Sequence, residues 1–102
     1  MIFARVTGTV VCTSKDEKLV GSRLLLAQPV DLSGSAKGSP LVAVDCVGAG
    51  EGELVLLVQG SSARQTTGTE GRPVDAVIFA IVDTVVQSGK TAFKKSEDAY
   101  VK

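Results

Sequence analysis

Few residues of this sequence could carry out acid–base or metal chemistry. The chain has 102 residues and no histidine, so the side chain that most often transfers protons at neutral pH, and most often binds metals, is missing. The remaining acid–base candidates are lone carboxylates with an arginine or a lysine as cationic partner: Asp45, Asp75 and Asp83, with Arg64. Lone carboxylates on strands are more often surface groups or hydrogen-bonded structural groups. The sequence therefore predicts no catalytic residue, no metal site and no cofactor.

The two cysteines are the next candidates for chemistry. Cys12 and Cys46 lie in apolar runs and lack the CxxC spacing that is typical of metal and redox sites. We interpret them as small buried thiols in a reducing cytosol. A disulfide or a reactive thiol is the alternative interpretation.

The overall charge balance argues against a nucleic-acid partner. The chain has 11 Lys and Arg and 11 Asp and Glu, whereas nucleic-acid binders usually carry a basic excess. Its aromatic residues are sparse for stacking on bases or sugars. No signal peptide is indicated, and the longest apolar run, 76–82, is too short to span a membrane. A net charge near zero also weakens the repulsion between copies of the chain, which favours self-association.

The elements that must position these residues are predicted to be β-strands joined by loops. In the first strand, Ile2, Ala4 and Val6 alternate with residues of the other face, which is the period-two pattern of a half-buried strand. Gly8 interrupts this pattern, and we expect a bulge or a bend there. The expected strands are 1–13, 22–30, 41–47, 53–59 and about 74–87.

These strands predict one all-β domain over residues 1–102, a small five-stranded antiparallel barrel. One short helical turn is expected after the fourth strand, at 60–65, where Ser61 is a plausible N-cap. Residues 88–102 are interpreted as a variable C-terminal tail.

Three of the expected strands carry more apolar residues than one face of a barrel strand can use. The segments 24–27, 54–58 and 76–82 are apolar on both sides, so half of these residues should point outward. Each outward Leu, Val or Ile contributes about 1.5–3 kcal/mol when it is covered, and a large exposed apolar patch marks an interaction surface. The pattern indicates an obligate oligomer. The alternative is a flatter sheet whose second face is covered by loops.

The segment Gly48-Ala49-Gly50 has three possible interpretations. A phosphate-binding loop is disfavoured because the GxxxxGK[ST] spacing is absent and Glu51 and Glu53 would repel phosphate. The segment could be an ordinary tight hairpin, or the point where backbones of several subunits meet around a rotation axis, where small residues fit best. If the backbones of several subunits meet there, Ala49→Trp would disturb ring assembly. If the segment is a plain hairpin, the same substitution would have a mainly local effect on stability.

Arg64 lies on the predicted turn that Ser61 and Ser62 brace, with Asp75 a short distance further along the chain. An intersubunit hydrogen bond or ion pair is reasonable for this arginine. An intrachain pair between Arg64 and Asp75 is equally compatible with the sequence.

Several short motifs occur in order along residues 1 to about 86. They are Phe3-Ala-Arg-Val-Thr-Gly-Thr-Val-Val, Leu24-Leu25-Leu26 followed by Gln28-Pro29, Asp45-Cys46-Val47-Gly48-Ala49-Gly50, Gly60-Ser61-Ser62-Ala63-Arg64, Pro73 to Ala76, and Ile81 to Asp83. Taken together they resemble the pentameric vertex proteins of bacterial microcompartment shells, the EutN/CcmL-type family.

The resemblance implies a barrel of OB-like topology that assembles with itself as a ring of five and has no catalytic activity. Such homopentamers occupy the vertices of shells built mostly of hexameric shell proteins, inside the bacterial cytoplasm. By the same resemblance, Val47, Gly48, Ala49 and Gly50 would lie at the five-fold axis or pore. The subunit interface would include Ser61, Ser62, Ala63, Arg64 and Asp75.

Two other functions are weighed against a structural shell protein. OB-like barrels often bind single-stranded nucleic acid or oligosaccharide, so a binding module is the main alternative, although the zero net charge argues against it. An enzyme ranks last because no motif and no histidine supports one.

Overall fold

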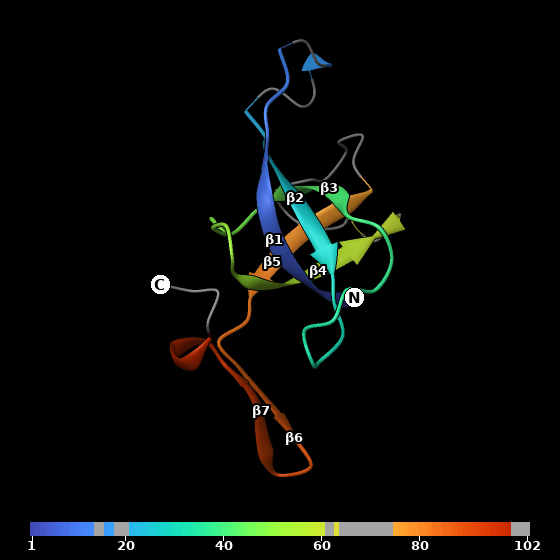
Figure 1. Cartoon of the computed structure of the whole chain (residues 1–102). Helices are drawn as coiled ribbons and strands as arrows, with labels where there is room; N and C mark the ends of the chain where they lie inside the picture. Colours follow the sequence, from blue (N-terminus) through green and yellow to red (C-terminus); the bar gives the residue numbers. More distant parts are fainter. Residues whose placement is uncertain (14–15, 18–20, 61–62, 64–74, 99–102) are drawn as a thin grey trace.

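A closed β-barrel forms the body of the molecule (Figure 1). The computed structural model describes residues 1–13, 16–17, 21–60, 63 and 75–98. The barrel strands are β1 (Ile2–Val10), β2 (Arg23–Pro29), β3 (Leu41–Asp45), β4 (Leu54–Gln59) and β5 (Ala76–Ile81). A hairpin of β6 (Thr84–Gln87) and β7 (Lys90–Lys94) projects from the barrel and leads into a short 3-10 helix, η3 (Lys95–Glu97). The prediction of an all-β barrel with five strands is confirmed.

The strands follow the order β1-β2-β3-β5-β4 around the barrel, and β4 returns to pair with β1. This is the Greek-key order of OB-like barrels. Every pair in the barrel is antiparallel except β3 with β5, which is parallel. The expected all-antiparallel barrel is therefore corrected at one pair. The parallel pair arises because β4 lies between β3 and β5 in the chain but not in the barrel.

The first strand carries the bulge that the sequence predicts. Val6 pairs with Ala27 and Gly8 pairs with Leu26, so one extra residue of β1 is accommodated between these two pairs. A bulge bends a strand and increases its twist. This bend suits β1, which pairs with β4 through its first half and with β2 along most of its length.

The barrel interior is filled by alternate residues of all five strands. Ala4 and Val6 of β1 are buried there, which confirms the core face predicted for the first strand. The other buried members of this cluster are Leu25, Ala27, Ala43, Ala49, Val55, Leu57, Ala76 and Ile78.

Much of the outward apolar surface is covered by the chain itself. One outer cluster contains the buried residues Val44, Ala63 and Val77. A second lies where the hairpin joins the barrel, and Val85 and Phe93 pack there against other members of the cluster. From the sequence, we expected this surface to be covered either by other subunits or by loops. Residues of the same chain cover part of this outward apolar surface. Val42 on β3 remains 47% exposed.

The expected long strand at 74–87 is wrong in one respect. β5 ends at Ile81, and β6 begins at Thr84 in a separate two-stranded sheet. Ser88 and Gly89 turn this hairpin with φ angles of 53° and 76°, as a two-residue turn with both central residues at positive φ requires. The segment expected as a tail from residue 88 thus contributes β7 and η3 in its described part.

The helical turn also differs in position from the prediction. The helical turn whose bounds the structure gives is η3, and it follows β7 rather than the fourth strand. Of the turn expected at 60–65, the described residues include only Gly60 and Ala63. No helix in the described part of the chain is long and apolar enough to cross a membrane.

Both cysteines are exposed, so the interpretation as buried thiols is wrong. Cys12 follows the end of β1 at Val10, and Cys46 follows the end of β3 at Asp45. The apolar runs that surround the two cysteines in the sequence continue past the ends of these strands, where the side chains no longer enter the barrel.

Candidate functional site

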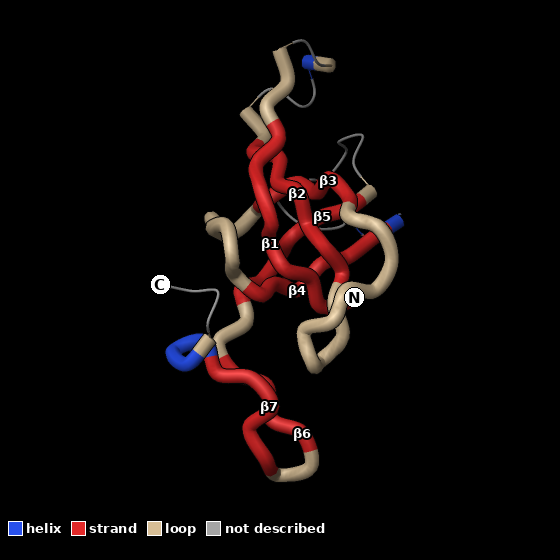
Figure 2. Tube along the Cα trace, in the orientation of Figure 1, coloured by secondary structure: helices blue, strands red, loops and turns tan. Residues whose placement is uncertain are grey.

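The connection from β3 to β4 is the best candidate for a functional site, and we call its residues 46–52 the glycine loop. It lies beside the barrel on the same side as η3 (Figure 2). Gly48 and Gly52 have φ angles of 75° and 92°, a backbone region that suits glycine. Val47 and Gly48 are exposed. Cys46 and Glu51 are exposed as well, so Gly48 is the one residue without a side chain among the exposed residues of this loop.

Asp45 anchors the first half of the glycine loop. Its Oδ1 accepts hydrogen bonds from the backbone N–H of Val47 at 3.1 Å and of Ala49 at 3.2 Å. Its Oδ2 accepts from Nη1 of Arg23 at 2.8 Å, and the same nitrogen donates to the carbonyl oxygen of Ala49 at 2.7 Å. The Asp45 side chain is 1% exposed. Both oxygens of this acid–base candidate are thus committed to holding the backbone.

Ala49 points into the barrel rather than out of the loop. Its side chain is fully buried and belongs to the barrel cluster. In the axial interpretation, neighbouring subunits were the reason for a small side chain at position 49, but the subunit's own core already imposes that restriction. Ala49→Trp would overpack the core, so it does not separate an axial loop from a plain hairpin.

Glu53 anchors the second half of the glycine loop. One carboxylate oxygen accepts from the backbone N–H of Gly50 at 2.6 Å, and the other accepts from Nζ of Lys95 at 2.5 Å. The bond from Lys95, assisted by that from Gly50, lowers the pKa of Glu53 below its ordinary value, and Glu53 in turn raises the pKa of Lys95. A Cβ at position 50 would lie 3.4 Å from the Glu53 carboxylate, which is van der Waals contact with the group that holds the Gly50 N–H.

Arg5 holds the end of the glycine loop from inside the fold. It is 9% exposed and donates from Nη1 to the carbonyl oxygen of Gly52 at 3.1 Å and to Asp98 at 2.5 Å. Its guanidinium also lies 5.8 Å from the centre of the Phe93 ring. The backbone adds two bonds between this region and β1, from Gly52 N–H to Val6 O and from Val6 N–H to Glu53 O.

Sequence reasoning missed Arg5, Arg23 and Lys95 as residues that position the glycine loop. The available signal for Arg5 was a single charged residue in the apolar half of the first strand. For Lys95 there was no local signal, because its partner Glu53 is 42 positions away in the sequence.

The predicted interface residues are only partly described. Ser61, Ser62 and Arg64 lie outside the described residues, so the expected pairing of Arg64 is not addressed. Ala63 is fully buried in an outer apolar cluster. Asp75 is exposed, and its carbonyl oxygen accepts from the N–H of Gly60 at 2.7 Å.

The described residues offer little for catalysis. A cleft of about 410 Å³ lies between the 31–34 loop and β7, and three carboxylates line it, Asp31, Glu97 and Asp98. Glu97 is exposed. Asp98 is paired with Arg5, and Asp31 accepts from Ser33 and Ser35. Within the described part of the chain, no group of His, Cys, Asp or Glu residues could hold a metal ion.

The fold and the site together define a small OB-like barrel with a rigidly held, side-chain-poor loop. The family model described as "Ethanolamine utilisation protein EutN/carboxysome" matches residues 1–83. This chain therefore belongs to the EutN/CcmL family, as its motifs suggested.

Named relatives are similar in sequence to this chain over nearly its whole length. The bacterial microcompartment shell vertex protein EutN of Salmonella typhimurium is 47% identical over 95 residues, which cover 93% of this chain and 96% of that protein. The carboxysome shell vertex protein CcmL of Gloeobacter violaceus is 44% identical over 97 residues, 95% of this chain and 97% of that protein. These relatives are shell vertex proteins of bacterial microcompartments and carboxysomes.

Solved structures agree as well. The structure of Gloeobacter violaceus CcmL superposes with a TM-score of 0.88 and covers 95% of this chain and 100% of that chain. The GrpN pentameric microcompartment shell protein from Rhodospirillum rubrum gives a TM-score of 0.77 at 45% identity, over 85% of this chain and 99% of that chain.

Proposed function

We propose that this chain forms a homopentamer that caps the vertices of a polyhedral bacterial microcompartment shell in the bacterial cytoplasm. The observation that carries the proposal is similarity at 44–47% identity, over more than nine-tenths of the chain, to proteins named for that position in a shell. The solved structure of one relative, similar at 45% identity, is described as pentameric.

The geometry of a polyhedral shell explains how a ring of five would act. Hexagonal tiles alone make a flat sheet, and a polyhedron closes only where five-fold units replace six-fold ones. A ring of five identical barrels supplies that unit, with head-to-tail contacts between different surfaces of neighbouring copies. The chain would thus provide curvature and closure rather than chemistry.

We place the exposed part of the glycine loop near the axis of this ring. Val47 and Gly48 are exposed there, as are Cys46 and Glu51, and a residue without a side chain, such as Gly48, suits a point where five copies converge. Ala49 and Gly50 would support them from behind, because Ala49 is buried in its own barrel. We place Ser61, Ser62, Arg64 and Asp75 at the subunit interface, on the strength of the family motif alone. Ala63 is fully buried within its own subunit and would support this segment rather than contact a neighbour.

The proposed partners are further copies of this chain and hexameric shell proteins. A non-enzymatic role is supported by the names of the relatives as shell proteins and by the use of Asp45 as a loop anchor. The alternative of a module that binds single-stranded nucleic acid or oligosaccharide has no support among the relatives, and the zero net charge argues against it.

Co-assembly with a hexameric shell protein from the same genome tests the proposal. Hexamers are produced with and without this chain, and the particles are imaged by electron microscopy. Closed polyhedra are expected only in the samples that contain this chain, and the chain should occupy their corners. Particles of the same shape with and without the chain, and no density for it at any corner, would overturn the proposal.

A further inference from the structure

The C-terminal part of the chain returns to the glycine loop through two ion pairs. We call residues 83–98 the clasp. Lys95 of the clasp donates to Glu53, whose other oxygen holds the N–H of Gly50. Asp98 accepts from Arg5, which also holds the carbonyl oxygen of Gly52. Each ion pair therefore ends on the backbone of the same short segment.

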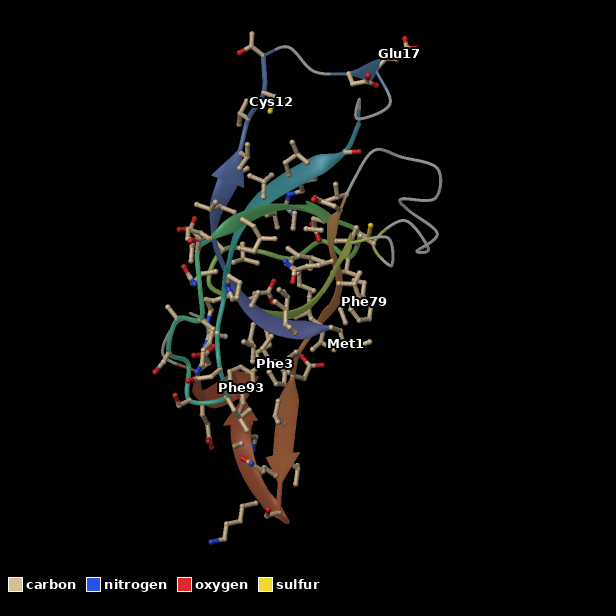
Figure 3. All side chains as sticks on the ribbon, turned by 90° about the vertical axis from the view of Figure 1, so that its right-hand side faces the viewer. Met1, Phe3, Cys12, Glu17, Phe79 and Phe93 are labelled. Carbon is tan, nitrogen blue, oxygen red and sulfur yellow. The ribbon has the colours of Figure 1, made fainter. Side chains whose placement is uncertain are left out.

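The clasp is itself fixed to the barrel at the base of the hairpin. Phe93 and Val85 of the clasp, like Phe3 of β1, pack against the cluster of buried residues Val30, Leu54 and Val82. Figure 3 shows Phe3 and Phe93 together at this junction. The backbone N–H of Lys95 donates to the carbonyl oxygen of Asp83 at 2.8 Å. The packing at the base of the hairpin and this backbone hydrogen bond thus fix the position of Lys95 beside the glycine loop.

The two ion pairs are partly withdrawn from water, the Arg5–Asp98 pair more than the Lys95–Glu53 pair. The side chains of Arg5 and Asp98 are 11% and 7% exposed, and those of Lys95 and Glu53 are 32% and 16% exposed. Exposed pairs contribute little because water and salt screen them, whereas partly buried, charge-assisted hydrogen bonds are screened less. Both pairs can therefore restrain the backbone to which they connect.

We infer that the clasp sets the conformation of the second half of the glycine loop, with Lys95 and Asp98 as positioning residues that act through Glu53 and Arg5. The importance of this loop for a ring axis rests on the proposed function, although the clasp is a contact within one chain. All of the clasp after Asp83 follows the 1–83 matched by the family model. The shape of the proposed axial opening would then depend on a segment outside the family-matched region.

Amide hydrogen exchange of the assembled protein tests the clasp. The variant Lys95→Met removes the charge, and Lys94→Met is the matched control because Lys94 is an exposed neighbour on β7. We expect the Gly50 amide to exchange about tenfold faster, or more, in K95M than in wild type, because its bond to Glu53 loses support. K94M should match wild type, and Lys95→Arg should restore slow exchange.

A second arm uses Asp98→Asn and salt. D98N should accelerate exchange at Gly52 more than at Gly50, and added salt should accelerate Gly50 exchange in wild type but not in K95M. Equal exchange at Gly50 in K95M, K94M and wild type would overturn the clasp. Native mass spectrometry of the same samples separates the two proposals. A monomeric wild type would overturn the pentamer and leave the clasp measurable, because the clasp lies within one chain.

Discussion

At the scale of single residues, Asp45 illustrates how a carboxylate can serve the backbone rather than chemistry. It accepts from two loop amides and from Arg23, and it is almost completely buried. The sequence could propose Asp45 only as a lone carboxylate. Its role depends on where the glycine loop turns, and that turn follows from the buried Ala49 and the positive φ of Gly48.

Removal of the Asp45 carboxylate should therefore destabilise the fold. We expect Asp45→Ala to lower the free energy of unfolding by about 2–4 kcal/mol, because two loop amides and the Arg23 guanidinium lose their acceptor. Urea denaturation at a fixed protein concentration measures the change, since association also contributes to apparent stability. The control is the exposed Asp83→Ala, and equal effects of the two substitutions would contradict this role.

Glu53 should make stability fall in acid. Its pKa lies below the ordinary 4.5 in the folded chain, so the unfolded chain takes up this proton first as pH drops, and stability is lost as pH falls through the folded pKa. From about pH 6 to about pH 3, Glu53→Gln should lose less stability than wild type. The exposed Glu51→Gln is the control, and it should follow the wild-type profile. A Glu53→Gln profile parallel to that of wild type would refute the assignment.

At the scale of elements, the hairpin of β6 and β7 depends on its base rather than its tip. An isolated two-stranded hairpin is marginally stable, and Phe93 packs at the base beside the Arg5 guanidinium. We expect Phe93→Ala to cost about 2–3 kcal/mol in unfolding free energy. Val86 at 63% exposure provides the control, so Val86→Ala should change little. The measurement is thermal or urea unfolding, and a neutral Phe93→Ala would show that the hairpin does not support the barrel.

The barrel elements were predictable where one face is buried and the other is not. Ala4 and Val6 alternate with other residues in β1, so the core face and the bulge at Gly8 were both visible in the sequence. Alternation disappears where both faces are covered. In β5 the inner Ile78 and the outer Val77 are both fully buried, so the pattern gave no sign that this strand ends at Ile81.

The loop anchors were not predictable for a different reason. Lys95 meets Glu53, and Asp98 meets Arg5, across large separations in sequence that only the closed barrel and the hairpin bring together. The identity of the glycine loop as the candidate site was nevertheless visible from its residue types. The residues that anchor this loop could be identified only from the structure.

At the scale of the whole molecule, Val47 replaces Ala49 as the test of the axial placement. Val47 is 39% exposed, so Val47→Trp should leave the stability of a single subunit almost unchanged. If five copies of the loop converge, it should lower the fraction of pentamer, measured by analytical ultracentrifugation. Val86→Trp at the exposed hairpin tip is the control. Equal pentamer fractions in the two variants would argue against the axial placement.

The proposed vertex role depends on how many copies of the chain assemble, and native mass spectrometry at micromolar concentration counts them. Outward apolar residues such as Val42, the near-zero net charge and the pentameric relative all favour association. We expect a dominant species with the mass of five chains. A dominant species with the mass of a single chain would contradict it.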